Sequence, residues 1–181
     1  PESVAREIQG YSENLILRPL EGSRFQPAHV GQVLESASEH DTMVLGPGLG
    51  NREDTMEAVR ALLDGFSGTA VVDADALAAV PDVETTAELI CTPHQGELVG
   101  MGGETSPDWR ERRDLVASFA AELGHTLLVK GHDDVVSDGE TTRVSRTGNP
   151  GMTVGGTGDV LAGITGALAA TQPPIHAAAL G

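Results

Sequence analysis

Four glycines lie close together in residues 149–159, directly before an apolar stretch. Because glycine adopts positive φ without a Cβ penalty, such a turn can bring successive backbone N–H groups together. Where the turn opens a helix, those groups and the positive end of the helix dipole bind anions, usually phosphates. Asp159 stands at that point, where ionisation is favoured and a general base is well placed. The structural alternative is that Thr157 and Asp159 only cap the helix.

Other residues suited to phosphate chemistry follow short apolar runs elsewhere in the chain. The runs end at residues 46–50, 73–75, 92–97 and 130–131, which are rich in glycine, carboxylates and polar groups. Ligands of open α/β sheets bind outside the carboxyl ends of the strands. If each run is a parallel strand, these segments meet at one edge of a sheet. The sequence therefore predicts a ligand crevice there.

Each polar side chain in these segments has both a functional and a structural interpretation. Lys130 is the only lysine in the chain and suits a compact charge on a phosphate, but it is also compatible with a solvated strand end. Asp73 and Asp75 can organise water or a cation near phosphates, or can cap a short helix through Leu77. His94 can hydrogen-bond to or stack on a substrate, or can be a plain loop residue. One His and one Glu at this spacing are too few for a zinc hydrolase site.

Short apolar runs alternate with longer helical patterns, which predicts βαβ units and a mainly parallel sheet. Small residues in the last predicted helix, around Ala162 and Gly166, indicate close approach to a neighbour. The turn at Asp138-Gly139 predicts a hairpin. Ser106-Pro107 predicts a helix start, and Gly124 predicts its end. The predicted strands are 15–17, 42–45, 70–72, 89–92, 126–130, 135–137 and 142–144, and the predicted helices are 30–37, one through 56–63, one from 106 to 123, and 158–170.

The composition restricts the class of partner. The chain of 181 residues carries 27 acidic and 11 basic residues, a net charge of −16, with acids spread along its length. Nucleic acid is an unsuitable partner, because neutralising its phosphates requires basic surface. Dispersed acidity with ten arginines and one lysine indicates a halophilic cytoplasm, although an ordinary acidic protein remains an alternative. The single Cys91 excludes an internal disulfide, fits a reducing, cytoplasmic compartment and is expected to be buried. No apolar stretch has the length of a membrane span.

Taken together, these segments resemble the ADP-dependent NAD(P)H-hydrate dehydratase family of the ribokinase-like superfamily. The order and spacing of the matching runs hold across essentially the whole chain, and the last run is nearly the family signature. These runs are residues 46–50, 73–77, 92–97, 129–131 and 148–163.

The resemblance implies a ribokinase-like α/β fold with a mainly parallel sheet flanked by helices in three layers. It also implies repair of hydrated NADH and NADPH. ADP, or ATP in some relatives, would phosphorylate the ring hydroxyl with Mg²⁺ present, and phosphate would then leave. By match to the family motif, Asp159 is the base and also contacts the hydrate, as do Gly48 and His94. The nucleotide would be held by Lys130, Gly131, His132, Asp133, Asp134 and Gly158, the transferring phosphoryl by Gly156, Thr157 and Gly158, and a Mg²⁺ ion by Glu97 through water.

The resemblance also sets the expected organisation. Residues 1–181 are expected to be a single dehydratase domain that lacks the family's N-terminal portion and last helices. The expected partners are the hydrate and the nucleotide, further copies of the chain in a homo-oligomer, and an epimerase domain, fused or separate. Two alternatives stay open. One is a small-molecule kinase of the hydroxymethylpyrimidine or thiazole type, and the other is a non-catalytic nucleotide-binding module.

Overall fold

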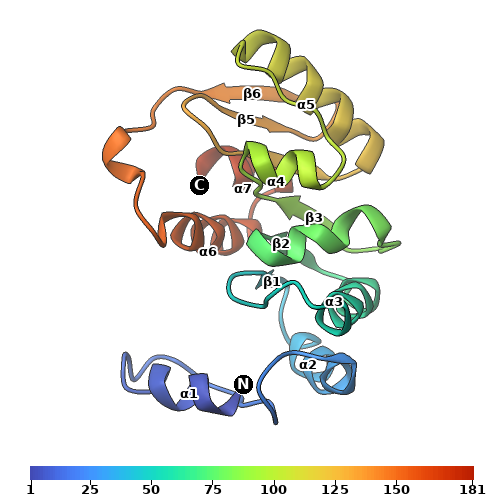
Figure 1. The fold of residues 1–181 in the computed structure, drawn as a ribbon, viewed down its shortest axis with the longest axis vertical. Helices are drawn as coiled ribbons and strands as arrows, with labels where there is room; N and C mark the ends of the chain where they lie inside the picture. Colours follow the sequence, from blue (N-terminus) through green and yellow to red (C-terminus); the bar gives the residue numbers. More distant parts are fainter.

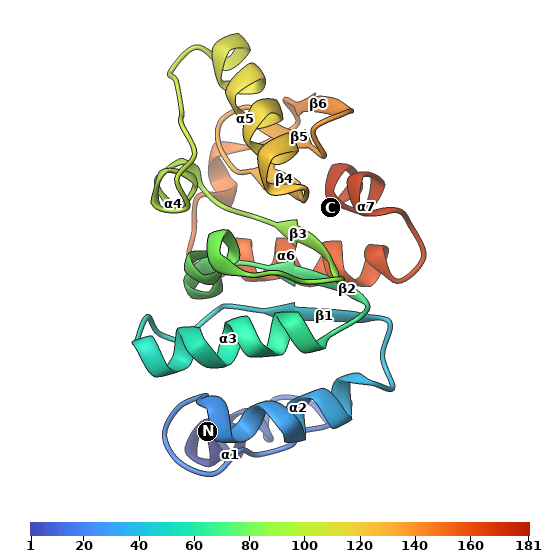
Figure 2. The same cartoon turned by 90° about the vertical axis from the view of Figure 1, so that its right-hand side faces the viewer.

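Six strands form one sheet whose spatial order follows the chain from β1 to β6 (Figures 1 and 2). The computed structural model describes all of residues 1–181. The strands are β1 (Thr42–Leu45), β2 (Thr69–Val72), β3 (Glu88–Cys91), β4 (Thr126–Val129), β5 (Asp134–Ser137) and β6 (Thr142–Ser145). The α-helices are α1 (Glu2–Ile8), α2 (Val30–Ala37), α3 (Glu53–Gly65), α4 (Gln95–Gly100), α5 (Trp109–Leu123), α6 (Thr157–Ala169) and α7 (Pro174–Leu180). The 3₁₀ helices are η1 (Pro27–His29), η2 (Ala74–Asp82) and η3 (Pro150–Met152).

The sheet separates two apolar layers, because successive side chains of a strand point to opposite faces. On β2, Ala70 and Val72 pack in the larger core with residues of α3, η2, α4 and α5. Val71, between them, packs with residues of α6 and α7 on the other face. β2 and β4 are buried at every position, as expected for central strands covered on both faces. The predicted three-layer α/β architecture is confirmed.

The first four strands pair in parallel, and β4, β5 and β6 pair antiparallel. The predicted hairpin joins β5 and β6. In its turn, Asp138 accepts hydrogen bonds from the N–H groups of Glu140 and Thr141, and Gly139 has a φ of +89°. The carboxyl ends of β1 to β4 therefore lie along one edge of the sheet, where the helices after β1, β2 and β3 begin.

The predicted start of α5 is displaced by two residues. Asp108, not Ser106, is the N-cap, and its carboxylate accepts hydrogen bonds from the N–H groups of Arg110 and Glu111. These bonds lower the pKa of Asp108. The Ser106 hydroxyl instead accepts from the Asp108 N–H, two residues further along the chain. Gly124 ends the helix in the left-handed conformation, as predicted.

The predicted strand at 15–17 is wrong. This segment has no regular structure, and Ile16 is 88% exposed. It belongs to the part of the chain around α1, which lies with α2 beyond β1 in both views (Figures 1 and 2). Three apolar residues cannot form a stable strand without a hydrogen-bonded neighbour.

The close approach predicted for the last helix occurs at Gly166. A Cβ at this position would lie 2.4 Å from a methyl group of Val44. Ala162 is fully buried, whereas Gly163 and Ala167 face solvent, so the small residues divide between the two sides of α6. Cys91 is buried as predicted, and burial raises the pKa of its thiol to about 12. None of the helices has both the length and the apolarity needed to cross a bilayer.

Candidate functional site

The loops after β1 and β2 are in direct backbone contact. Gly46 has a φ of +134°, and a Cβ there would lie 1.7 Å from the Asp73 carbonyl oxygen. The Asp73 N–H donates to the Leu45 carbonyl at 3.0 Å, and the Gly50 N–H donates to the Asp75 carboxylate at 2.8 Å. Glycine is therefore required at position 46 because the next loop occupies the space of a side chain.

This contact predicts a large stability difference between two glycines of one loop. Gly46→Ala should lower the free energy of unfolding by at least about 3 kcal/mol, because it combines an unfavourable φ with a clash against backbone. Gly50→Ala, with a φ of +78° and open space around it, should cost only about 1–2 kcal/mol. Urea denaturation of both variants measures the difference. Equal losses would contradict the close packing at Gly46.

Asp73 and Lys130 form an ion pair at the edge of the sheet where the parallel strands have their carboxyl ends. Lys130 Nζ lies 2.8 Å from Asp73 Oδ1, and the Thr92 hydroxyl donates to the same oxygen at 2.8 Å. The side chains of Asp73 and Lys130 are only 3% and 22% exposed. The solvated alternative for Lys130 is therefore wrong, and Asp73 makes no side-chain hydrogen bond as cap of η2. The segments after β2, β3 and β4 meet at this pair.

The N-terminus of α6 lies against the same ion pair. A Cβ on Gly158 would be 3.5 Å from Lys130 Nζ and 3.8 Å from Asp73 Oδ2. Gly156, with a φ of +90°, is the N-cap. The N–H groups of Gly155, Gly156, Gly158 and Asp159 have no hydrogen-bond partner within the chain. A helix N-terminus with free N–H groups beside an ammonium group is an anion-binding geometry.

The two polar side chains at the start of α6 do different things. The Thr157 hydroxyl is bound internally, donating to the carbonyl oxygens of Met152 and Val154 at 2.9 Å. The Asp159 side chain is exposed in the first turn and caps no backbone group of the helix. Asp159 is thus free to meet a ligand that docks on the helix N-terminus.

His94 and Glu97 cap α4 together. The Glu97 N–H donates to His94 Nδ1 at 3.0 Å, and the His94 N–H donates to Glu97 Oε2 at 2.7 Å. His94 also lies beside Lys130, whose N–H donates to the Pro93 carbonyl at 2.8 Å. His94 keeps an exposed ring next to the site, while Oε2 of the Glu97 carboxylate is bonded within the cap. Nowhere in residues 1–181 do three His, Cys, Asp or Glu side chains gather in a metal-binding group.

The loop after β4 is held by its own carboxylates. The Gly131 N–H donates to Asp134 Oδ1 at 2.8 Å, and burial raises the pKa of Asp134 while this bond opposes the rise. Asp133 lies within 3.5 Å of His132 Nδ1 and 3.3 Å of Arg146 Nε. His132 and the Gly131 backbone remain exposed and can reach a ligand.

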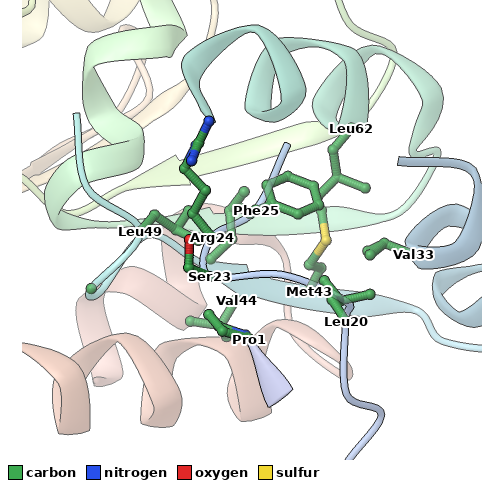
Figure 3. A pocket seen from close by; sticks show the side chains of 12 residues that line it. Pro1, Leu20, Ser23, Arg24, Phe25, Val33, Met43, Val44, Leu49 and Leu62 are labelled. Carbon is green, nitrogen blue, oxygen red and sulfur yellow. The ribbon is translucent and has the colours of Figure 1, made fainter. Parts of the chain in front are cut away.

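An apolar cavity of about 330 Å³ lies against β1, apart from the ion pair (Figure 3). Figure 3 shows Phe25, Met43 and Leu62 converging on it. Of the predicted site residues, only Gly48 lines it.

Comparison with known proteins decides the family. A family model described as NAD(P)H-hydrate dehydratase matches residues 2–181. The bifunctional NAD(P)H-hydrate repair enzyme Nnr of Pyrobaculum aerophilum is 42% identical over 184 residues, covering 99% of this chain and 37% of the relative. The enzyme of the same name from Methanopyrus kandleri is 42% identical over 161 residues, covering 87% of this chain and 32% of the relative. The chain belongs to the NAD(P)H-hydrate dehydratase family.

A solved structure agrees with this membership. The ADP/ATP-dependent NAD(P)H-hydrate dehydratase from Bacillus subtilis, co-crystallised with ATP and Mg²⁺, matches with a TM-score of 0.67 at 28% identity. The match covers 80% of this chain and 55% of that chain. The fold is that of the ribokinase-like proteins. The chain spans about a third of the length of the curated relatives it matches.

Most residues that the dehydratase resemblance singled out lie in connected loops. Lys130, Gly158 and His94 are neighbours, and Asp159 follows Gly158. Gly48 lies on the loop that contacts the Asp73 segment. The buried pair between Asp73 and Lys130 and the hydroxyl of Thr92 were not predicted as a unit. The available signal in the sequence was that Asp73 and Thr92 each directly follow an apolar strand.

Proposed function

We propose that the full-length protein dehydrates NADH hydrate and NADPH hydrate back to the reduced dinucleotides, with ADP or ATP as co-substrate. The observation that carries this proposal is the start of α6. Four unpaired N–H groups lie there, one of them on Gly158, which packs against Lys130, and the exposed Asp159 is the next residue. This arrangement offers an anion site and a base at one point, which is what phosphoryl transfer to a hydroxyl requires.

In the proposed reaction, the ring hydroxyl of the hydrate attacks the terminal phosphorus of the nucleotide. The bond from that phosphorus to the rest of the nucleotide breaks, releasing AMP from ADP or ADP from ATP. Asp159 accepts the hydroxyl proton, while the free N–H groups of Gly156 and Gly158 stabilise the charge on the transferring phosphoryl group. Thr157, the other predicted residue of this anion site, has its N–H bonded to the Val154 carbonyl. The adjacent ring nitrogen then pushes electrons, the carbon–oxygen bond breaks, and phosphate leaves. Loss of a proton from the neighbouring ring carbon restores the double bond.

The other predicted residues divide between the two substrates. Lys130, Gly131, His132, Asp133, Asp134 and Gly158 are proposed to bind the nucleotide. Their loop follows Lys130 directly, and Gly158 at the start of α6 packs against the Lys130 side chain, which supports this role. Gly48 and His94 are proposed to contact the hydrate, supported by their exposure on loops at the same edge of the sheet.

The donor set fits Mg²⁺ brought by the nucleotide and does not fit an ion held by the protein. One Glu97 oxygen, Oε2, is bonded in the cap of α4, and Asp73 is paired with Lys130, so neither carboxylate is free to hold an ion by both oxygens. Mg²⁺ at such sites keeps several waters and binds substrate phosphates with one or two carboxylates. Glu97, at 25% exposure, is the proposed carboxylate that reaches the ion through water. The ion would neutralise charge on the phosphates.

The proposal is tested by turnover. The full-length protein, incubated with NADH hydrate and either ADP or ATP, should restore the absorbance of the reduced nicotinamide. Omitting the nucleotide should abolish the recovery. Recovery at the same rate without nucleotide would contradict the proposed route.

The proposal also covers the domain organisation, the cellular compartment and the protein partners of the enzyme. We place residues 1–181 in one dehydratase domain, supported by the single sheet that runs through them. The buried free thiol of Cys91 supports a reducing cytoplasm. An epimerase on the same chain is supported by the description of the curated relatives as bifunctional. Self-association into a homo-oligomer stays a prediction, which light scattering measures directly.

A high-salt requirement is predicted from the charge of −16. Self-repulsion opposes the compact state, and the screening length falls from about 8 Å at physiological ionic strength to about 3 Å at 1 M. The melting temperature should therefore rise as KCl increases from 0.1 M to molar concentrations, while ADP affinity falls because the attraction to Lys130 is screened. A thermal melt and calorimetry across KCl concentrations measure both. A melting temperature that is constant or falls with KCl would reject the halophilic interpretation.

A further inference from the structure

Aromatic and basic side chains with no role in the reaction described above surround Asp133 of the loop 131–134. We call this group the Trp109 cluster, and its members are Trp109, Arg110, Arg112, Asp133 and Arg146. The guanidinium carbon of Arg146 lies 4.0 Å from the centre of the Trp109 ring, and that of Arg110 lies at 4.4 Å. Both distances are within the range of cation–π attraction. Two of the 11 basic residues therefore meet at the chain's one tryptophan.

Arginines of the Trp109 cluster hold Asp133 by its side chain and by its backbone. Arg146 Nε, directly after β6, lies 3.3 Å from Asp133 Oδ1. Arg112, buried in α5, donates to the Asp133 carbonyl at 3.2 Å and to the Ser106 carbonyl at 2.9 Å. Asp133 is thus connected to α5 and to the end of β6, neither of which carries a proposed substrate contact.

These contacts determine where the middle of the loop lies. The loop is also closed on itself by the bond from the Gly131 N–H to Asp134. Between those two residues stand only His132 and Asp133. With Asp133 held from two sides, the backbone of His132 and the direction of its exposed side chain have little freedom left. The stacking of Arg146 on Trp109 restricts the guanidinium in turn, so the ion pair with Asp133 forms at a lower entropic cost.

We propose that Arg146 and Trp109 are positioning residues for the nucleotide: Arg146, oriented by Trp109, holds Asp133 and keeps loop 131–134 in the conformation that binds ADP. This inference rests on the nucleotide-binding role proposed for that loop. It goes beyond that role by assigning the conformation of the loop to side chains that need not contact the nucleotide. Loss of either side chain should weaken ADP binding without changing the phosphoryl-transfer step.

The test uses the full-length protein and compares variants at three positions. Arg146→Met and Trp109→Leu should each raise the KM and the calorimetric Kd for ADP by about five- to tenfold, with kcat within about twofold of the parent. Trp109→Phe keeps an aromatic face for Arg146 and should keep an ADP affinity within about twofold of the parent. Arg143→Met removes an exposed arginine of β6 outside the Trp109 cluster and serves as the matched control. Arg146 is 54% exposed, so Arg146→Met should fold normally.

The results that would contradict the proposed function differ from those that would contradict only the positioning role of Arg146 and Trp109. A parent that binds neither ADP nor ATP would overturn the proposed function and this inference with it. A parent that binds ADP, with affinity unchanged in both Arg146→Met and Trp109→Leu, would overturn the inference alone. A fall in kcat matching the fall in ADP affinity, together with a lower melting temperature, would reduce the Trp109 cluster to a stabilising contact and also overturn it.

Discussion

Asp159→Asn in the full-length protein should lower the turnover of NADH hydrate by about 10²–10⁴-fold, the usual loss when a general base is removed. Asparagine has nearly the shape of aspartate but cannot accept the hydroxyl proton. The anion site should survive, since it is made of backbone N–H groups and Lys130. ADP affinity should therefore stay within about threefold of the parent.

The stability of Asp159→Asn should change little. A carboxylate in the first turn of an exposed helix contributes only about 0.3–1 kcal/mol through the helix dipole. Glu140→Gln is the matched control, because it removes an exposed carboxylate in the β5–β6 turn by the same isosteric change. Steady-state kinetics and calorimetry measure both variants. Turnover of Asp159→Asn within threefold of the parent would end its assignment as the base.

Lys130→Met should strongly destabilise the protein, and it should also weaken ADP binding by at least about tenfold. It leaves the carboxylate of Asp73, which is 3% exposed, without its cation. Breaking a buried ion pair in this way costs about 3–5 kcal/mol, and the partial exposure of Lys130 places the expected loss near the lower value. Urea denaturation measures the stability, and calorimetry measures the ADP affinity.

A double variant separates the two roles of Lys130. Lys130→Met with Asp73→Asn removes both charges, so no unpaired charge is buried and most of the stability should return. The affinity for ADP should stay low, because the cation beside the α6 N-terminus is still missing. If the double variant bound ADP as tightly as the parent, Lys130 would only neutralise Asp73, and its proposed contact with the nucleotide would be rejected.

The edge of the sheet that carries the site was predictable from the sequence. Each of four short apolar runs ends in a segment of glycine, carboxylate or lysine, and parallel strands bring such ends together. The Asp138-Gly139 turn and the Gly124 helix end were equally visible, because their chemistry is local. The family resemblance then assigned roles to Asp159 and Lys130 that spacing alone left open.

The features that could not be predicted from the sequence depend on contacts between segments that are distant in the chain. Asp73 and Lys130 are 57 positions apart, and their pairing follows from the adjacency of β2, β3 and β4 in the sheet. The failure at 15–17 has the same origin, since an apolar run becomes a strand only where a neighbouring strand is available. The two candidate helix caps, Ser106 and Asp108, are only two residues apart. Such local competition lies within the usual uncertainty of helix ends.

The most direct test of the central claim is an account of all products from a single incubation of NADH hydrate and ADP with the full-length protein. Phosphorylation of the hydrate at the α6 N-terminus followed by elimination predicts AMP, free phosphate and NADH in equal amounts, measured together by mass spectrometry. A phosphorylated small molecule that accumulates with no NADH recovered would contradict the account. That result would indicate a kinase that uses the same anion site and the same base.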